Sequence, residues 1–77
     1  MKLEVGKYYD VTIYFSDVHN NRMIVYIIYK LGNKFMIKCI KDYEYDTKMD
    51  CDEYYIDSDM ITKYKLLNNK ELLACTL

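Results

Sequence analysis

Apolar and polar side chains alternate with a period of two near the start of the chain. In residues 8–15 (YYDVTIYF) every second position is apolar, and the positions between include Asp10 and Thr12. This alternation predicts a strand with one buried face. The polar stretch 16–21 (SDVHNN) predicts a turn, because Ser, Asp and Asn side chains bond readily to nearby backbone groups.

A second strand is predicted between Arg22 and Lys30, where residues 23–29 are all apolar or aromatic. These residues are mostly β-branched or aromatic, which favours a strand over a helix. Gly32 and Asn33 then suit a tight hairpin turn with glycine at its first central position. The return strand is predicted from Lys34 to about Tyr45.

The rest of the chain predicts shorter elements. In order, they are a polar, acidic loop (46–53), a short strand (54–56), a turn or single helical turn (57–60), a strand (62–67), a tight turn (68–69) and a final strand (70–77). A short terminal helix over 71–77 is the alternative to the final strand.

Five or six short strands joined by tight turns predict an all-β fold, either a small antiparallel barrel or a strongly bent sheet. At 77 residues and 9.3 kDa, the chain is predicted to form one domain over residues 1–77. Residues 55–61 (YIDSDMI) resemble the short turn that connects the last strands of SH3-like barrels. This resemblance implies an SH3-like fold and carries no functional motif.

Apolar residues occupy both faces of the second and third predicted strands. A bent sheet or small barrel needs only one buried face, so the other must be covered. The C-terminal hairpin of a curled barrel is one candidate cover, and a second molecule is the other. The hairpin register, and with it the identity of the core face, stays open. If a second molecule is the cover, the self-association residues are Tyr26, Ile28, Tyr29, Met36 and Ile40. Tyr8 and Tyr14 are further tyrosines suited to such a contact.

Acidic residues are concentrated in one segment. The net charge of the chain is −1, but residues 42–59 hold eight acids and one lysine, which leaves −7 there and +6 elsewhere. In residues 42–46 (DYEYD) acids alternate with tyrosines, so a strand would place three carboxylates on one face about 7 Å apart.

Three interpretations of the acidic segment compete: a solvated loop, a surface that imitates a phosphate backbone for a basic protein, and a cation site. Phosphates also recur at about 7 Å, and carboxylates can pair with the same arginines and lysines. The calcium-loop pattern with its central glycine is missing from residues 50–53, so we predict no metal site. The candidate partner-binding residues are Asp42, Tyr43, Glu44, Tyr45, Asp46, Asp50, Asp52, Glu53 and Tyr54.

Catalytic signals are missing from the sequence. Cys39, Cys51 and Cys75 lie at least twelve positions apart, which fits reduced thiols rather than a zinc site. The single histidine, His19, falls in a predicted turn, and no nucleophile motif or Gly-rich phosphate loop is present. We therefore predict neither an enzyme nor a cofactor. The basic residues are dispersed, so direct nucleic-acid binding is not predicted. No apolar run reaches the ~20 residues that span a bilayer, and residues 1–6 lack a signal core, so we expect a cytoplasmic location.

Ten tyrosines, no proline and no tryptophan accompany many Lys, Asn and Ile residues, a composition typical of an AT-rich genome. In size, tyrosine content and local acidity the chain resembles small phage-encoded proteins that block host machinery, anti-CRISPR proteins among them. The resemblance implies a stoichiometric inhibitor in the bacterial cytoplasm, whose acidic, tyrosine-rich surface occupies a basic site on a nucleic-acid-handling protein. The alternative is a structural or adaptor module that self-associates, for example as a homodimer, through its second apolar face.

Overall fold

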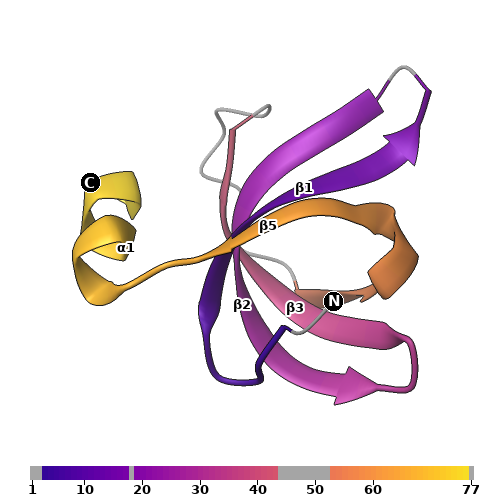
Figure 1. The fold of residues 1–77 in the computed structure, drawn as a ribbon, viewed down its shortest axis with the longest axis horizontal. Coiled ribbons are helices and arrows are strands. Elements are labelled where there is room, and N and C mark those ends of the chain that lie inside the picture. Colours follow the sequence, from indigo (N-terminus) through magenta and orange to yellow (C-terminus); the bar gives the residue numbers. More distant parts are fainter. Residues whose placement is uncertain (1–2, 18, 44–52, 77) are drawn as a thin grey trace.

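A single antiparallel sheet dominates the computed structural model, which describes residues 3–17, 19–43 and 53–76. The described residues form β1 (Tyr8–Ser16), β2 (His19–Leu31), β3 (Lys34–Asp42), β4 (Glu53–Asp57), η1 (Ser58–Met60), β5 (Ile61–Leu66) and α1 (Asn69–Thr76). The strand order is β4-β3-β2-β1-β5, and the sheet curls strongly around its core, while α1 lies outside the curl (Figure 1). The predicted all-β, bent-sheet fold is confirmed.

One face of the sheet, called the inner face below, carries the core. Its side chains alternate along each strand, as the period of two predicts. Phe35 and Ile37 of β3 are almost fully buried there, opposite Ile56 and Ile27 of the neighbouring strands. The core consists of Leu3, Tyr9, Val11, Ile13, Met23, Val25, Ile27, Phe35, Ile37, Ile56 and Ile61, with Cys39 and Met60 packed against it.

Two bulges interrupt the pairing of β2 with β3. Ile27 pairs with Ile37, but Tyr29 pairs with Met36, so Ile28 is an extra residue on β2. On β3, Ile40 is the extra residue between two regular pairs. Bulges bend a strand and increase its twist, which a sheet that curls on itself requires. The predicted two-residue turn at Gly32 and Asn33 is confirmed, with a φ of +61° at Gly32.

The turn predicted over residues 16–21 is wrong in its extent. Ser16 belongs to β1 and β2 already begins at His19, so the connection is much shorter. Asn21 is buried on the inner face opposite Ile13. Pairing with β1 therefore outweighs the local turn preference of this polar stretch. The return strand ends at Asp42, and Tyr45 lies outside the described residues.

The final strand predicted over residues 70–77 is also wrong, because Asn69–Thr76 form α1. Asn68 caps the helix: its Oδ1 accepts a hydrogen bond from the Glu71 backbone N–H (2.8 Å), and its own N–H donates to Glu71 Oε1 (3.3 Å). This reciprocal pair is a capping box. Lys65 Nζ lies 2.7 Å from Glu71 Oε2 and ties the first helical turn to β5. No helix in the described part of the chain has the length and apolar character needed to cross a bilayer.

Candidate functional site: the outer face of the sheet

Two tyrosine pairs lie on the outer face, opposite the core. The ring centroids of Tyr8 and Tyr26 are 4.9 Å apart, and those of Tyr29 and Tyr55 are 5.9 Å apart in an edge-on arrangement. The hydroxyls of Tyr29 and Tyr55 also share a hydrogen bond. Together with Met36 these four residues are called the outer tyrosine cluster.

The pairing of β3 with β2 and β4 places side chains of the cluster beside one another. Met36 stands between two buried residues of β3, so its side chain points away from the core, and it pairs with Tyr29 on one side and Tyr55 on the other. A row of three large side chains thus crosses β2, β3 and β4. Tyr29 is 40% exposed and Tyr55 46%, whereas the other members are half-buried. Tyrosine at this exposure offers a broad apolar surface with a hydroxyl that can bond to a partner.

Hydrogen bonding sets the electrostatics of the cluster. The bond to Tyr55 is the main cause that raises the pKa of Tyr29 above 10.0, and desolvation and the negative charge of Glu53 act in the same direction. The raised pKa of Tyr29 is thus mainly a consequence of its contact with Tyr55.

Cations surround Tyr43, where the acidic segment begins. The Arg22 guanidinium donates to both carboxylate oxygens of Asp10, at 3.1 Å from Nε to Oδ1 and 2.6 Å from Nη2 to Oδ2. Its Cζ also lies 4.6 Å from the centre of the Tyr43 ring, and Lys41 Nζ lies 4.8 Å from it. Such cation–π contacts hold the ring on the outer face.

The acidic candidates are divided between the faces. Asp42 lies on the inner side, where Asn21 Nδ2 donates to its Oδ2 at 3.4 Å, so it does not share a surface with the tyrosine cluster. Glu53 is exposed and pairs with Lys38, whose side of the sheet is that of Met36. Tyr54 pairs with Ile37 through its backbone. Glu44, Tyr45, Asp46, Asp50 and Asp52 lie outside the described residues.

The self-association candidates are brought together in part. Tyr26, Tyr29 and Met36 share the outer face, while Ile28 and Ile40 are the half-buried bulge residues. Tyr55 was missed by the sequence reasoning. Its position next to Ile56 was the available signal, because a buried Ile56 places its neighbour on the opposite face.

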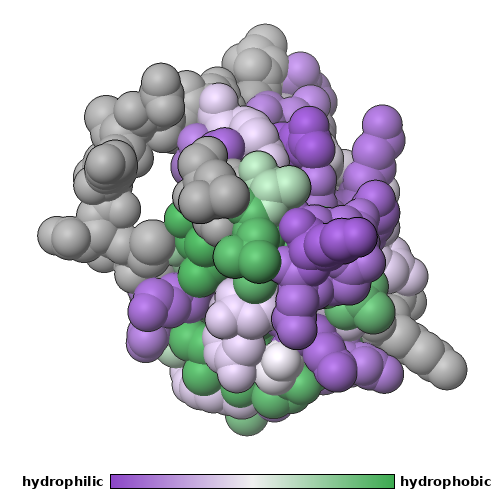
Figure 2. Space-filling view, turned by 90° about the vertical axis from the view of Figure 1, so that its left-hand side faces the viewer, coloured by the Kyte–Doolittle hydropathy of each residue, from purple (hydrophilic) through white to green (hydrophobic). Residues whose placement is uncertain are grey.

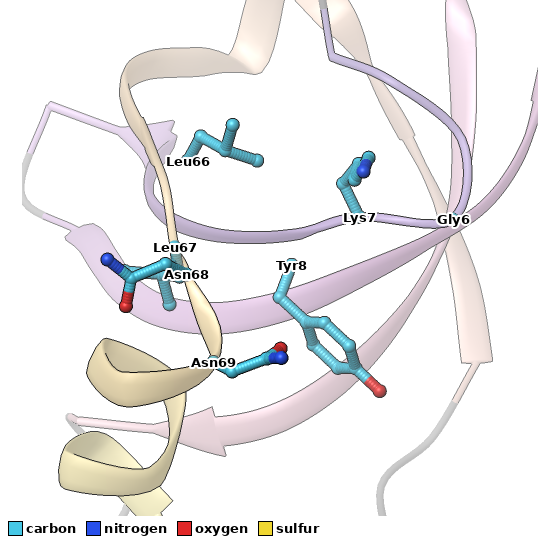
Figure 3. A pocket seen from close by; sticks show the side chains of 7 residues that line it. All are labelled: Gly6, Lys7, Tyr8, Leu66, Leu67, Asn68 and Asn69. Atoms are coloured by element: carbon cyan, nitrogen blue, oxygen red, sulfur yellow. The ribbon is translucent and has the colours of Figure 1, made fainter.

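An open pocket of about 420 Å³ lies between the start of β1 and the start of α1, lined by Gly6, Lys7, Tyr8, Leu66, Leu67, Asn68 and Asn69. Leu66 and Lys7 lie at one end of it, and Tyr8 and Asn69 lie at the other (Figure 3). Seen from the side of α1, apolar side chains gather in the middle of the surface, beside a strongly hydrophilic border (Figure 2). Leu66 and Leu73 are both exposed.

Metal-ligating residues do not converge in residues 3–17, 19–43 and 53–76, where no group of three His, Cys, Asp or Glu side chains could hold an ion. Cys39 is half-buried and packs against the core. His19 lies in β2 rather than in a turn. No protein-family model, curated protein or solved structure matches the chain.

Proposed function

We propose that the chain is a non-enzymatic binding protein that occupies a protein partner's surface with the outer tyrosine cluster. The observation that carries this proposal is the position of Tyr43 and Glu53. Both residues belong to the acidic segment (residues 42–59), and both lie on the face that holds the cluster. Two described residues of the acidic segment therefore lie on the same side of the sheet as the outer tyrosine cluster.

Preorganisation favours binding through this cluster. Each tyrosine pair is already fixed by ring contact, and Tyr29 and Tyr55 are fixed further by their shared hydrogen bond. Side chains that are ordered before binding lose less entropy when a partner covers them. Tyrosines are also enriched among the residues that dominate interface energies.

The acidic segment gives the partner's chemistry. A net charge of −7 over residues 42–59 favours a basic partner, of the kind that handles nucleic acid. On the outer face, however, Arg22, Lys38 and Lys41 lie among the described residues of β2 and β3. Among the described residues, the acidic contribution to this face therefore comes from Glu53 and Asp57 of β4. Together with the resemblance in size, tyrosine content and local acidity, this charge supports the proposal of a stoichiometric inhibitor of the phage type.

Capture from the lysate of a low-GC bacterium, with and without about 0.5 M salt, tests the proposal. A bound protein that depends on charge is expected to be released at high salt. Tyr29→Lys is expected to abolish capture, whereas Tyr14→Lys is the matched control. Tyr14 has the same 40% exposure as Tyr29 and lies near the far end of β1, paired with Asn20. Equal capture by both variants would exclude the cluster.

Self-association through the cluster is the second candidate. The exposure of Tyr29 and Tyr55 favours it, because two copies could cover each other's rings. Static light scattering at several concentrations is then expected to show a dimer that Tyr29→Lys converts to a folded monomer. A monomer at every concentration would exclude this candidate.

A further inference from the structure

Strand β5 ends the sheet on the side opposite β4, and within the described residues only β1 pairs with it. Tyr9 pairs with Leu66 and Asp10 with Lys65, and the Leu67 backbone N–H donates to the Tyr8 carbonyl at 2.9 Å. In an antiparallel ladder the backbone groups that bond to one neighbour alternate with groups that point the other way. The N–H and C=O of Tyr64 and Leu66 therefore point to the open side of β5.

Side chains along this edge separate by chemistry. Tyr64 and Leu66 lie on the inner side, opposite Val11 and Tyr9, and are 48% and 51% exposed. Lys63 and Lys65 lie on the outer side, opposite Thr12 and Asp10, and are exposed. The edge thus presents two large apolar groups on one side and two lysines on the other, of which Lys65 also pairs with Glu71 of α1 and Lys63 carries the main attraction for an acidic strand.

The two edges of the sheet differ in charge. On β4, Glu53, Tyr55 and Asp57 occupy the outer positions, so that edge is acidic where β5 is basic. An acidic strand is repelled by β4 and attracted by β5. A second copy of β5 suits the site poorly, because antiparallel pairing brings the lysines of both copies together on the outer side.

We propose that β5 is a docking edge for an extended peptide segment of a partner protein in which acidic and apolar residues alternate. The segment adds a sixth strand beside β5. Its backbone bonds to Tyr64 and Leu66, its apolar side chains cover those of the same two residues, and its carboxylates face Lys63 and Lys65. Strand addition of this kind takes its affinity from main-chain bonds and its specificity from alternate side chains. The Tyr29–Tyr55 pair of the outer tyrosine cluster lies on β2 and β4, away from this edge in the strand order.

An eight-residue peptide in which glutamate and valine alternate, capped at both ends, is the probe. Amide hydrogen exchange followed by NMR is expected to show slower exchange at the Tyr64 and Leu66 N–H groups when the peptide is present at millimolar concentration. The same peptide with lysine in place of glutamate is expected to leave these two amides unchanged. Unchanged exchange with the acidic peptide, or equal protection by both peptides, would overturn the proposal.

Charge reversal provides the matched variants. Lys63→Glu is expected to weaken binding of the acidic peptide about tenfold, since it replaces one attractive pair by a repulsive one. Lys34→Glu changes another exposed lysine, at the start of β3, and is expected to have no effect. Equal affinity of the two variants, with both folded by circular dichroism, would also overturn the proposal.

Discussion

Tyr29 and Tyr55 share a hydroxyl–hydroxyl hydrogen bond, although they belong to the non-adjacent strands β2 and β4. Met36 of β3 pairs with both, so the two rings reach toward each other above its side of the sheet. This bridge makes one continuous surface from three strands. It is the feature that unites the proposed binding face.

The bridge predicts an abnormal titration of Tyr29. Because its pKa is raised above 10.0, chiefly by the bond to Tyr55, the Tyr29 hydroxyl is expected to ionise later than an ordinary tyrosine. The contribution of this bond to the stability of the fold is fully present at pH values below the pKa of Tyr29 in the unfolded chain. It is lost as the pH rises through the higher pKa that Tyr29 has in the folded protein. Carbon-13 NMR of labelled tyrosine measures this directly. In Tyr55→Phe the Tyr29 pKa should fall toward 10.0; no fall would show that the bond is not the cause.

The burial of Asn21 near the start of β2 predicts that a charge at this position strongly destabilises the fold. This side chain is 5% exposed, its Oδ1 has no hydrogen-bond partner, and its Nδ2 faces Asp42. Asn21→Asp places a second carboxylate beside the first, and we expect the free energy of unfolding at neutral pH to fall by about 3 kcal/mol. Lowering the pH should recover part of this loss, because one carboxyl then takes up a proton.

Asn20→Asp is the matched control, since Asn20 is exposed and its neighbour in sequence is the buried residue. Urea unfolding of the two variants gives the comparison. Equal stability of Asn21→Asp and Asn20→Asp would contradict the described position of Asn21.

Helix α1 is predicted to depend on its cap and on pH. An eight-residue helix is short for independent stability, so loss of the cap in Asn68→Ala, worth about 1 kcal/mol, is expected to fray residues 69–76. The pKa of Glu71 is lowered, chiefly by its bond to Lys65 and then by the Asn68 backbone. The contribution of ionised Glu71 to the stability of α1 is therefore present at pH values above the ordinary Glu pKa. It is lost as the pH falls through the lowered pKa of the folded protein. Cα chemical shifts of α1 at neutral and acidic pH measure both effects. Helical shifts in the wild type at acidic pH would contradict the predicted pH dependence. Helical shifts in Asn68→Ala at neutral pH would contradict the predicted role of the cap.

Reversal of acidic charge tests the partner's chemistry. Changing Asp50, Asp52 and Glu53 to lysine takes residues 42–59 from −7 to −1. The fold should survive, because like-charge repulsion is removed. Binding to a basic partner should weaken by about three orders of magnitude if each pair is worth about 1.5 kcal/mol. Lys48→Glu is the opposite control and should bind at least as well as the wild type. Short DNA should compete with the wild type for its partner. Unchanged affinity of the triple variant would contradict a binding role and favour the interpretation of the acidic segment as a solvated loop.

Much of the fold follows from the sequence because the period of two is a local signal. It locates β1, β2 and β3 and the turn at Gly32 without reference to the rest of the chain. Bulges at Ile28 and Ile40 are not local in this sense, since each depends on which residues of two strands face each other. Without them the inner and outer faces of β2 could not be separated.

The polar stretch before Met23 and the C-terminal segment show the other limits. Asn20 and Asn21 have turn propensity, but pairing with β1 places them in a strand. The final helix was predicted only as an alternative, although Asn68 and Glu71 have the spacing of a capping box. The outer tyrosine cluster could be predicted only from the register of three strands, and the sequence does not fix that register. For this reason Tyr55 is not among the predicted site residues.

The dissociation constant of the complex with the captured partner, measured for the wild type, Tyr29→Lys and Tyr14→Lys, tests the central claim most directly. A hot-spot tyrosine is worth at least about 2 kcal/mol, so Tyr29→Lys should weaken binding about thirtyfold or more. Tyr14→Lys should bind like the wild type. Wild-type affinity in folded Tyr29→Lys, or an equal loss in Tyr14→Lys, would contradict the claim that the outer tyrosine cluster holds the partner.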